Sequence, residues 1–291
     1  MEKDRRGEGP VEPPLPHEIP GFAAFGHLAC RGLSNTRDLG GMPTADGRRI
    51  KPGRLVRSGA LHRATDDDLS LLQGAHRVVR VVDLRTELER SHDPDPAGRR
   101  LPETDFYDLP VFDTEELGIT HGGGLLGDLK AFGRLNGAPY KVVEALYPQA
   151  LLGEQGMRAY ARFLEILLEA QSDATLWHCS EGKDRAGLAS AIAECALGVP
   201  EDYIRSDYLA TNIFARTRAE RVLDDLGRHH LARDADADVD ALFYAYPDYL
   251  DAAFKAVGER YGSLLGYIEE GLGFGPDKQR GLRDRYLEAV S

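Results

Sequence analysis

The sequence predicts an α/β fold with a mainly parallel central sheet flanked by helices. Two short apolar stretches, residues 77–85 and 174–178, have the composition of buried strands. The alanine-rich segment 185–197 follows the second stretch after a short loop and is typical of a helix. Strands that alternate with helices along a chain favour a parallel sheet covered by helices, so these observations together indicate the α/β class.

The remaining elements follow from local signals. Thr65 is a typical helix N-cap residue, and the aspartates and leucines that follow it predict a helix that begins there. Residues 106–112 are expected to form another strand. The apolar spacing of residues 157–170 indicates an amphipathic helix, and Gly198 is expected to end the alanine-rich helix.

The chain is expected to fold as one domain over residues 22–291. Residues 1–21 carry five prolines among charged residues, which predicts a disordered N-terminal tail. The stretch 115–139 is dense in glycine and is a candidate mobile loop or lid. Several further helices are expected after residue 202.

The composition excludes several classes of protein. Acidic residues outnumber basic ones by 48 to 36, and the resulting net charge of −12 disfavours a nucleic-acid partner. No apolar stretch approaches the roughly 18 residues of an integral membrane segment. The N-terminus lacks the apolar core of a signal peptide. We therefore expect a cytoplasmic protein. Secretion without a visible signal peptide is the alternative.

One of the three cysteines lies in a stretch that carries chemistry. Residues 178–187 read His-Cys-Ser-Glu-Gly-Lys-Asp-Arg-Ala-Gly and lie between a predicted strand and a predicted helix. A loop that leads into a helix N-terminus presents successive backbone N–H groups, which bind a tetrahedral oxyanion such as phosphate. The same groups favour a thiolate at Cys179, placed for in-line attack on phosphorus. We expect a cysteinyl phosphate that water hydrolyses in a second step.

Other residues of this stretch have candidate roles. Arg185 lies on the first helical turn, where its planar guanidinium can hold two phosphate oxygens. Asp184 is the candidate general acid for the leaving group, and Asp83, at the end of a strand, is its rival. The expected phosphate-binding residues are Ser180, Glu181, Gly182 and Lys183. We expect Glu181 to turn its carboxylate toward solvent. Candidates for orienting the loop are His178, Arg37, Asp38 and Asp83.

This stretch resembles the active loop of the atypical bacterial protein-tyrosine phosphatase family, which includes phosphoinositide-directed members. Other parts of the chain resemble the same family, over about residues 30–290; they are 35–41, 46–48, 52–55, 57–59, 82–85, 207–209 and 261–263. The resemblance implies a cysteine-phosphatase fold that works without a metal or other cofactor. It also implies a helical lid, which residues 202–250 could supply.

The resemblance carries individual roles over to matching positions. It implies that Cys179 is the nucleophile, Arg185 the phosphate binder and Asp184 an acid inside the loop. Lys183 matches a lysine associated with lipid phosphates. Ala186 stands where the family usually has threonine, whose hydroxyl would stabilise the departing thiolate. We therefore expect slower hydrolysis of the phosphoenzyme rather than loss of activity.

The expected function is metal-independent hydrolysis of phosphomonoesters, foremost phosphotyrosine in a protein or peptide, with phosphoserine or phosphothreonine as further substrates. A phosphoinositide or inositol phosphate phosphatase is the nearest alternative. Lys183 favours that alternative, whereas Glu181 and the acidic net charge disfavour work at a membrane. A catalytically weak phosphate-binding module is supported only by Ala186. A sulfur-transfer or arsenate-reducing enzyme would also use a cradled cysteine, but no second cysteine has a spacing that suggests a partner.

Overall fold

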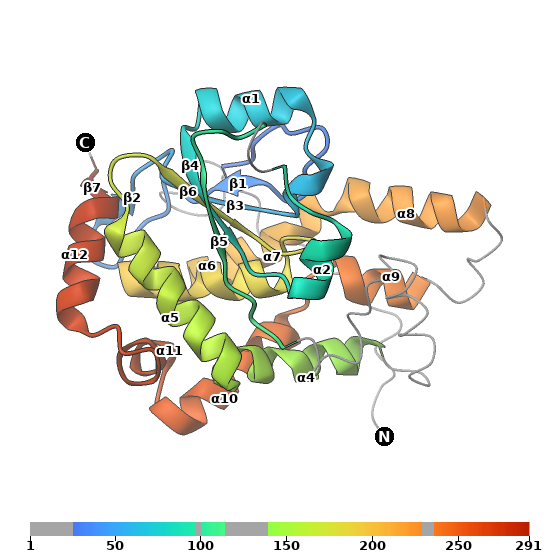
Figure 1. Ribbon diagram of the computed structural model, residues 1–291. Coiled ribbons are helices and arrows are strands. Elements are labelled where there is room, and N and C mark those ends of the chain that lie inside the picture. Colours follow the sequence, from blue (N-terminus) through green and yellow to red (C-terminus); the bar gives the residue numbers. More distant parts are fainter. Residues whose placement is uncertain (1–25, 97–99, 114–138, 229–235, 291) are drawn as a thin grey trace, which may run out of the picture.

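The computed structural model of the chain describes residues 26–96, 100–113, 139–228 and 236–290 (Figure 1). Its central sheet consists, in spatial order, of β1 (Arg37–Asp38), β3 (Leu55–Ser58), β6 (Ala174–His178), β4 (Val78–Asp83) and β5 (Asp105–Asp108). The last four strands of this order run parallel, and β1 pairs antiparallel with β3 at one edge. The predicted mainly parallel sheet is confirmed.

Two of the three predicted strands lie where we expected them, and the third is shorter. The stretches 77–85 and 174–178 contain β4 and β6, whereas β5 ends at Asp108 instead of continuing to residue 112. The backbone N–H of Leu109 still donates to Asp83 O, at 2.8 Å. Pro110 has no N–H group, so the ladder of hydrogen bonds cannot continue through it.

Helices cover both faces of the sheet (Figure 1). On one face lies α1 (Asp66–Gly74), and on the other lie α5 (Glu154–Glu169) and α6 (Asp184–Leu197). The other helices of the described residues are α2 (Glu87–His92), α4 (Pro139–Leu152), α7 (Glu201–Phe214), α8 (Arg216–Arg228), α9 (Asp236–Phe243), α10 (Pro247–Tyr261), α11 (Leu264–Gly266) and α12 (Pro276–Tyr286), together with the short 3-10 helix Leu61–Arg63 and the π-helix Tyr267–Gly271.

The alternation of side chains along the strands separates two cores. Val81 and Leu176 point to the face that α1 covers and share a buried cluster with Leu69 of that helix. Their neighbours Val82 and Trp177 point to the opposite face and belong to the larger cluster that includes α5 and α6. The central strands are therefore buried on both sides, as expected for a parallel sheet.

The helix boundaries largely follow the sequence signals. Thr65 caps α1 in a reciprocal capping box with Asp68, as its position before the aspartates predicts. The helix expected over residues 157–170 is α5, which begins three residues earlier, at Glu154. Gly198 ends α6 with a φ of 86°, in the left-handed region where glycine is favoured.

Part of the predicted organisation lies outside the described residues. The expected tail over 1–21 and nearly all of the candidate lid at 115–139 belong to this part. The described residues within 202–250 are largely helical, with α7, α8, α9 and the start of α10; that they serve as a lid stays a prediction. A small antiparallel pair, β2 (Arg48–Ile50) with β7 (Leu287–Ala289), ties the end of the chain to its N-terminal part. Among the described residues, every helix is too short or too polar to cross a bilayer.

Candidate active site

The carboxyl ends of three neighbouring strands meet at the start of the 179–183 loop. Ser58 of β3 and Asp83 of β4 both lie in register with His178, the last residue of β6. Cys179 follows directly, with 2% of its surface exposed, and the loop enters α6 at Asp184. Ligands of open α/β sheets bind at this edge. The sheet therefore places Cys179 where a ligand would bind.

Gly182 allows the loop to lie close against β3. Its φ of 70° is in the left-handed region, which glycine adopts at little cost. A Cβ atom at this position would lie 2.6 Å from the carbonyl carbon and oxygen of Ser58, well inside van der Waals contact. The close approach therefore requires glycine on both conformational and steric grounds.

Two side chains hold the backbone of the loop from the scaffold side. Asn35 Nδ2 and Arg57 Nη2 donate to Gly182 O at 2.9 and 2.7 Å. The C=O and N–H groups of a trans peptide point in opposite directions. The N–H of Lys183 therefore points away from these donors.

The carbonyl of Ser180 is held in the same way, by Ala60 N at 3.1 Å and Arg63 Nη1 at 3.2 Å. The neighbouring Glu181 side chain is only 18% exposed and pairs with Arg63 at 2.9 Å, with Arg218 at 3.7 Å on its other side. Our expectation that Glu181 faces solvent is therefore wrong. Two arginines neutralise its carboxylate beside the loop and draw it out of the solvent.

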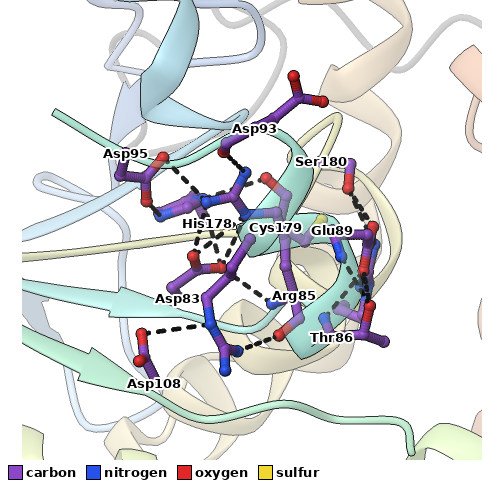
Figure 2. Close-up of polar contacts among 12 residues, drawn as sticks. Asp83, Arg85, Thr86, Glu89, Asp93, Asp95, Asp108, His178, Cys179 and Ser180 are labelled. Atoms are coloured by element: carbon purple, nitrogen blue, oxygen red, sulfur yellow. Dashed lines mark hydrogen bonds and ion pairs between the residues drawn. The ribbon is translucent and has the colours of Figure 1, made fainter. Parts of the chain in front are cut away.

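Arg185 is fixed by a carboxylate from a different element. Glu89 of α2 accepts from Arg185 Nη1 at 2.6 Å and from Nη2 at 2.8 Å. The same carboxylate accepts from Ser180 Oγ and from Thr86 N (Figure 2). Burial acts to raise the pKa of Glu89, but Arg185 and Ser180 outweigh it and hold this pKa well below its ordinary value. Glu89 is thus an ionised brace that orients the guanidinium.

Asp184 and Lys183 face the helices on the other side of the loop. Asp184 Oδ1 accepts from Tyr147 Oη at 2.6 Å and lies 3.3 Å from Lys183 Nζ. Lys183 Nζ donates to Ala241 O at 2.6 Å and to Tyr244 O at 3.3 Å, at the end of α9. Burial lowers the pKa of Lys183, against the opposing effect of Asp184. In this arrangement the lysine binds the backbone of the helical region 202–250.

A buried charged cluster lies behind Cys179 (Figure 2). His178 Nε2 lies 2.8 Å from a carboxylate oxygen of Asp95, and Arg85 pairs with Asp83 at 2.7 Å and with Asp95 at 3.0 Å. Burial lowers the pKa of His178, but the two carboxylates outweigh it, so the net shift is upward. The two carboxylates therefore favour the charged form of the imidazole next to the loop.

The same cluster offers ligand atoms that a metal ion could use. One atom from each of Asp83, Asp95 and His178 lies within 4.8 Å of the others, and this is the one such group among the described residues. Arg85, however, already contacts both carboxylates. Its guanidinium supplies the positive charge that these acids need, so the cluster is better described as a charge network than as a metal site.

Comparison with known proteins agrees with this geometry. The model of the "Tyrosine phosphatase family" matches residues 28–288. The chain belongs to the tyrosine phosphatase family. A Cupriavidus necator protein named "Putative tyrosine-protein phosphatase" is 32% identical over 246 residues, which span 84% of each chain. A Mycobacterium tuberculosis protein named "Triple specificity protein phosphatase" is 28% identical over 259 residues, 82% of this chain and 91% of the relative. The protein is thus a protein-tyrosine phosphatase with a cysteine-phosphatase fold.

The candidate orienting residues of this phosphatase have different places. Arg37 is fully buried; it pairs with Asp207 at 2.8 Å and donates to the side chain of Asn35, which itself holds the loop. Asp38 accepts from the backbone of Gly40 and Gly53 and so holds together the two ends of the connection between β1 and β3. The rival acid, Asp83, pairs with Arg85 within the charge network.

Several residues of the phosphatase site have no role in the sequence-based predictions. Glu89 and Tyr147 contact Arg185 and Asp184 directly, and Asn35 and Arg57 hold the loop. The spacing Thr86-x-x-Glu89 after a predicted strand matches a capping box, which could have marked the start of α2. Nothing in that spacing indicates that the capping carboxylate also reaches Arg185.

Proposed function

We propose that this phosphatase hydrolyses phosphotyrosine in proteins or peptides through a cysteinyl phosphate on Cys179. The observation that carries the proposal is the placement of Cys179 and Arg185 around one loop. Donors on the scaffold side turn the loop carbonyls outward, at Gly182 and Ser180, and Glu89 orients the guanidinium. Inward N–H groups and a fixed arginine suit the equatorial oxygens of a phosphoryl group.

In the first step the thiolate of Cys179 attacks phosphorus. An S–P bond forms while the bond from phosphorus to the tyrosyl oxygen breaks, with Arg185 balancing the charge on the equatorial oxygens. Asp184 gives its proton to the departing phenolate oxygen, so that neutral tyrosine leaves. The exposed fraction of its side chain, 37%, supports access to a substrate.

In the second step water attacks the phosphocysteine. The Asp184 carboxylate takes a proton from that water, an O–P bond forms, and the S–P bond breaks to return the Cys179 thiolate and release inorganic phosphate. Ala186 follows the arginine and brings no hydroxyl to the departing sulfur. The proposal therefore keeps a slow second step as one of its consequences.

The position of Lys183 favours a phosphorylated protein over a phosphorylated lipid. Its ammonium group donates to two backbone carbonyls and lies 5.3 Å from the ring centre of Tyr249. A lysine with these contacts is not presented at the mouth for a second phosphate. Phosphoinositide hydrolysis is the second candidate. Its support from the M. tuberculosis relative is that the name of that protein records more than one specificity.

The test compares hydrolysis of a phosphotyrosine peptide and of a short-chain phosphoinositide, in EDTA, by the wild type and by Cys179→Ser. Cys195→Ser is the matched control, because it makes the same substitution at a cysteine inside α6 that has no proposed role in the reaction. We expect hydrolysis of the peptide by the wild type and the control, and none by Cys179→Ser. Loss of activity in chelator, or activity retained without the Cys179 thiol, would contradict the mechanism. Normal phosphate binding without turnover would point to a binding module.

A further inference from the structure

The hydroxyl groups of Tyr208 and Tyr147 and the carboxylate of Asp184 form a hydrogen-bonded chain that ends at the start of α6, directly after the 179–183 loop. Tyr147 of α4 donates its phenol proton to Asp184 Oδ1 at 2.6 Å, and the Tyr208 hydroxyl of α7 lies 2.6 Å from the Tyr147 hydroxyl. Both tyrosines are at most 1% exposed. Phenylalanine would fill the same buried space as Tyr147. What the tyrosine adds is a hydroxyl group in direct contact with the partly exposed carboxylate of Asp184.

The direction of these hydrogen bonds follows from a count of protons. A neutral phenol has a single proton to donate. Because the proton of Tyr147 goes to Asp184, the bond between the two tyrosines must be donated by Tyr208. Burial raises the pKa of both phenols well above the ordinary tyrosine value, and the charge of Asp184 raises them further. The two tyrosines therefore remain donors whenever Asp184 is a carboxylate.

The two oxygens of Asp184 are consequently not equivalent. Oδ1 has Tyr147 at 2.6 Å and the Lys183 ammonium at 3.3 Å, and both groups are donors. A proton on Oδ1 would face these donors, so the acidic proton belongs on Oδ2. Resting on the proposed function, we infer that Tyr147, oriented by Tyr208, is a positioning residue that reserves Oδ2 of Asp184 for proton transfer to the leaving oxygen.

Leaving-group dependence tests this role. Protonation matters when the departing oxygen is strongly basic and matters little when it is already a stable anion, as in 4-nitrophenolate. We expect Tyr147→Phe to lower kcat/KM for phenyl phosphate about tenfold or more, and for 4-nitrophenyl phosphate by less than about threefold. The ratio kcat/KM suits the question because it reports the steps up to departure of the leaving group.

Two further variants separate positioning from a merely structural role. Asp184→Asn should show the same leaving-group dependence, and adding Tyr147→Phe to it should change kcat/KM little further, because both substitutions remove one function. Tyr286→Phe is the matched control, since it deletes a buried hydroxyl that donates to Leu167 O at 2.9 Å, in another part of the core. Additive losses, or equal losses on both substrates, would overturn the inference.

The outcomes also separate this inference from the proposed function. Hydrolysis that survives Cys179→Ser removes the proposed mechanism, and with it the role of Tyr147. A normal leaving-group dependence in Asp184→Asn removes the acid assignment. A steep dependence in Asp184→Asn but not in Tyr147→Phe overturns the positioning role alone. If Tyr147→Phe does not fold, Tyr208→Phe replaces it and should shift the dependence in the same direction by a smaller factor.

Discussion

Replacing Glu89 with glutamine isolates the contribution of one charge to the orientation of Arg185. The native carboxylate accepts both guanidinium bonds, at 2.6 and 2.8 Å. Glutamine keeps the shape of the side chain and one acceptor oxygen, but its NH₂ group then faces an N–H donor of the Arg185 guanidinium. A hydrogen bond to a charged group contributes about 1.5–3 kcal/mol, and about 1.4 kcal/mol corresponds to a tenfold change in rate. We therefore expect kcat/KM for a phosphotyrosine peptide to fall about 10- to 100-fold.

The assay is steady-state hydrolysis by Glu89→Gln beside Glu87→Gln. Glu87 lies two residues away on the same helix and is exposed, so it controls for the loss of a charge on α2. The sign of the effect is informative, since a carboxylate that competed with substrate for Arg185 would be inhibitory and its removal would raise activity. A rise in kcat/KM, or a change within about twofold, would refute the brace.

Three further predictions concern the same loop. Ala186→Thr should accelerate breakdown of the phosphoenzyme and reduce the burst of product in rapid-mixing experiments; an unchanged burst and turnover would count against a slow second step. Gly182→Ala should abolish activity and lower the free energy of unfolding by more than Gly47→Ala does. Both variants carry the roughly 1–2 kcal/mol cost of a positive φ, but of the two only Gly182→Ala also brings the new Cβ against backbone atoms. The depressed pKa of Glu89 means that its ion pair stabilises the fold at neutral pH. This contribution is lost progressively as the pH falls from the ordinary glutamate value of roughly 4.3 toward the lower pKa of the folded state. Acid titrations should therefore show a steeper loss of stability in the wild type than in Glu89→Gln, and parallel curves would contradict this assignment.

Local patterns were sufficient to predict the elements that build the loop. The apolar stretch before His178 predicts β6, because a strand buried on both sides is apolar throughout. The alanine-rich stretch after Lys183 predicts α6, which ends at Gly198. The motif between them then falls at the carboxyl edge of the sheet. The exception is β5, where Pro110 ends the strand before the apolar pattern does.

The partners of the loop could not be predicted from such patterns because they depend on distant chain segments meeting in space. Glu89 lies 96 residues before Arg185, and Tyr147 lies 37 residues before Asp184. Sequence spacing alone cannot show which carboxylate meets a given guanidinium. Glu181 illustrates the same limit: its sequence neighbours suggest an exposed acid, whereas Arg63 and Arg218 from two other elements enclose it.

The most direct test of the mechanism is chemical trapping of its intermediate. The wild type is mixed rapidly with a phosphotyrosine peptide, quenched in acid, digested and examined by mass spectrometry for the position of the phosphoryl group. We predict phosphocysteine at Cys179 in the wild type, in larger amount in the native Ala186 chain than in Ala186→Thr, and none in Cys179→Ser. Product formation with no phosphoryl group on Cys179 at any quench time, or with the group on another residue, would contradict the account.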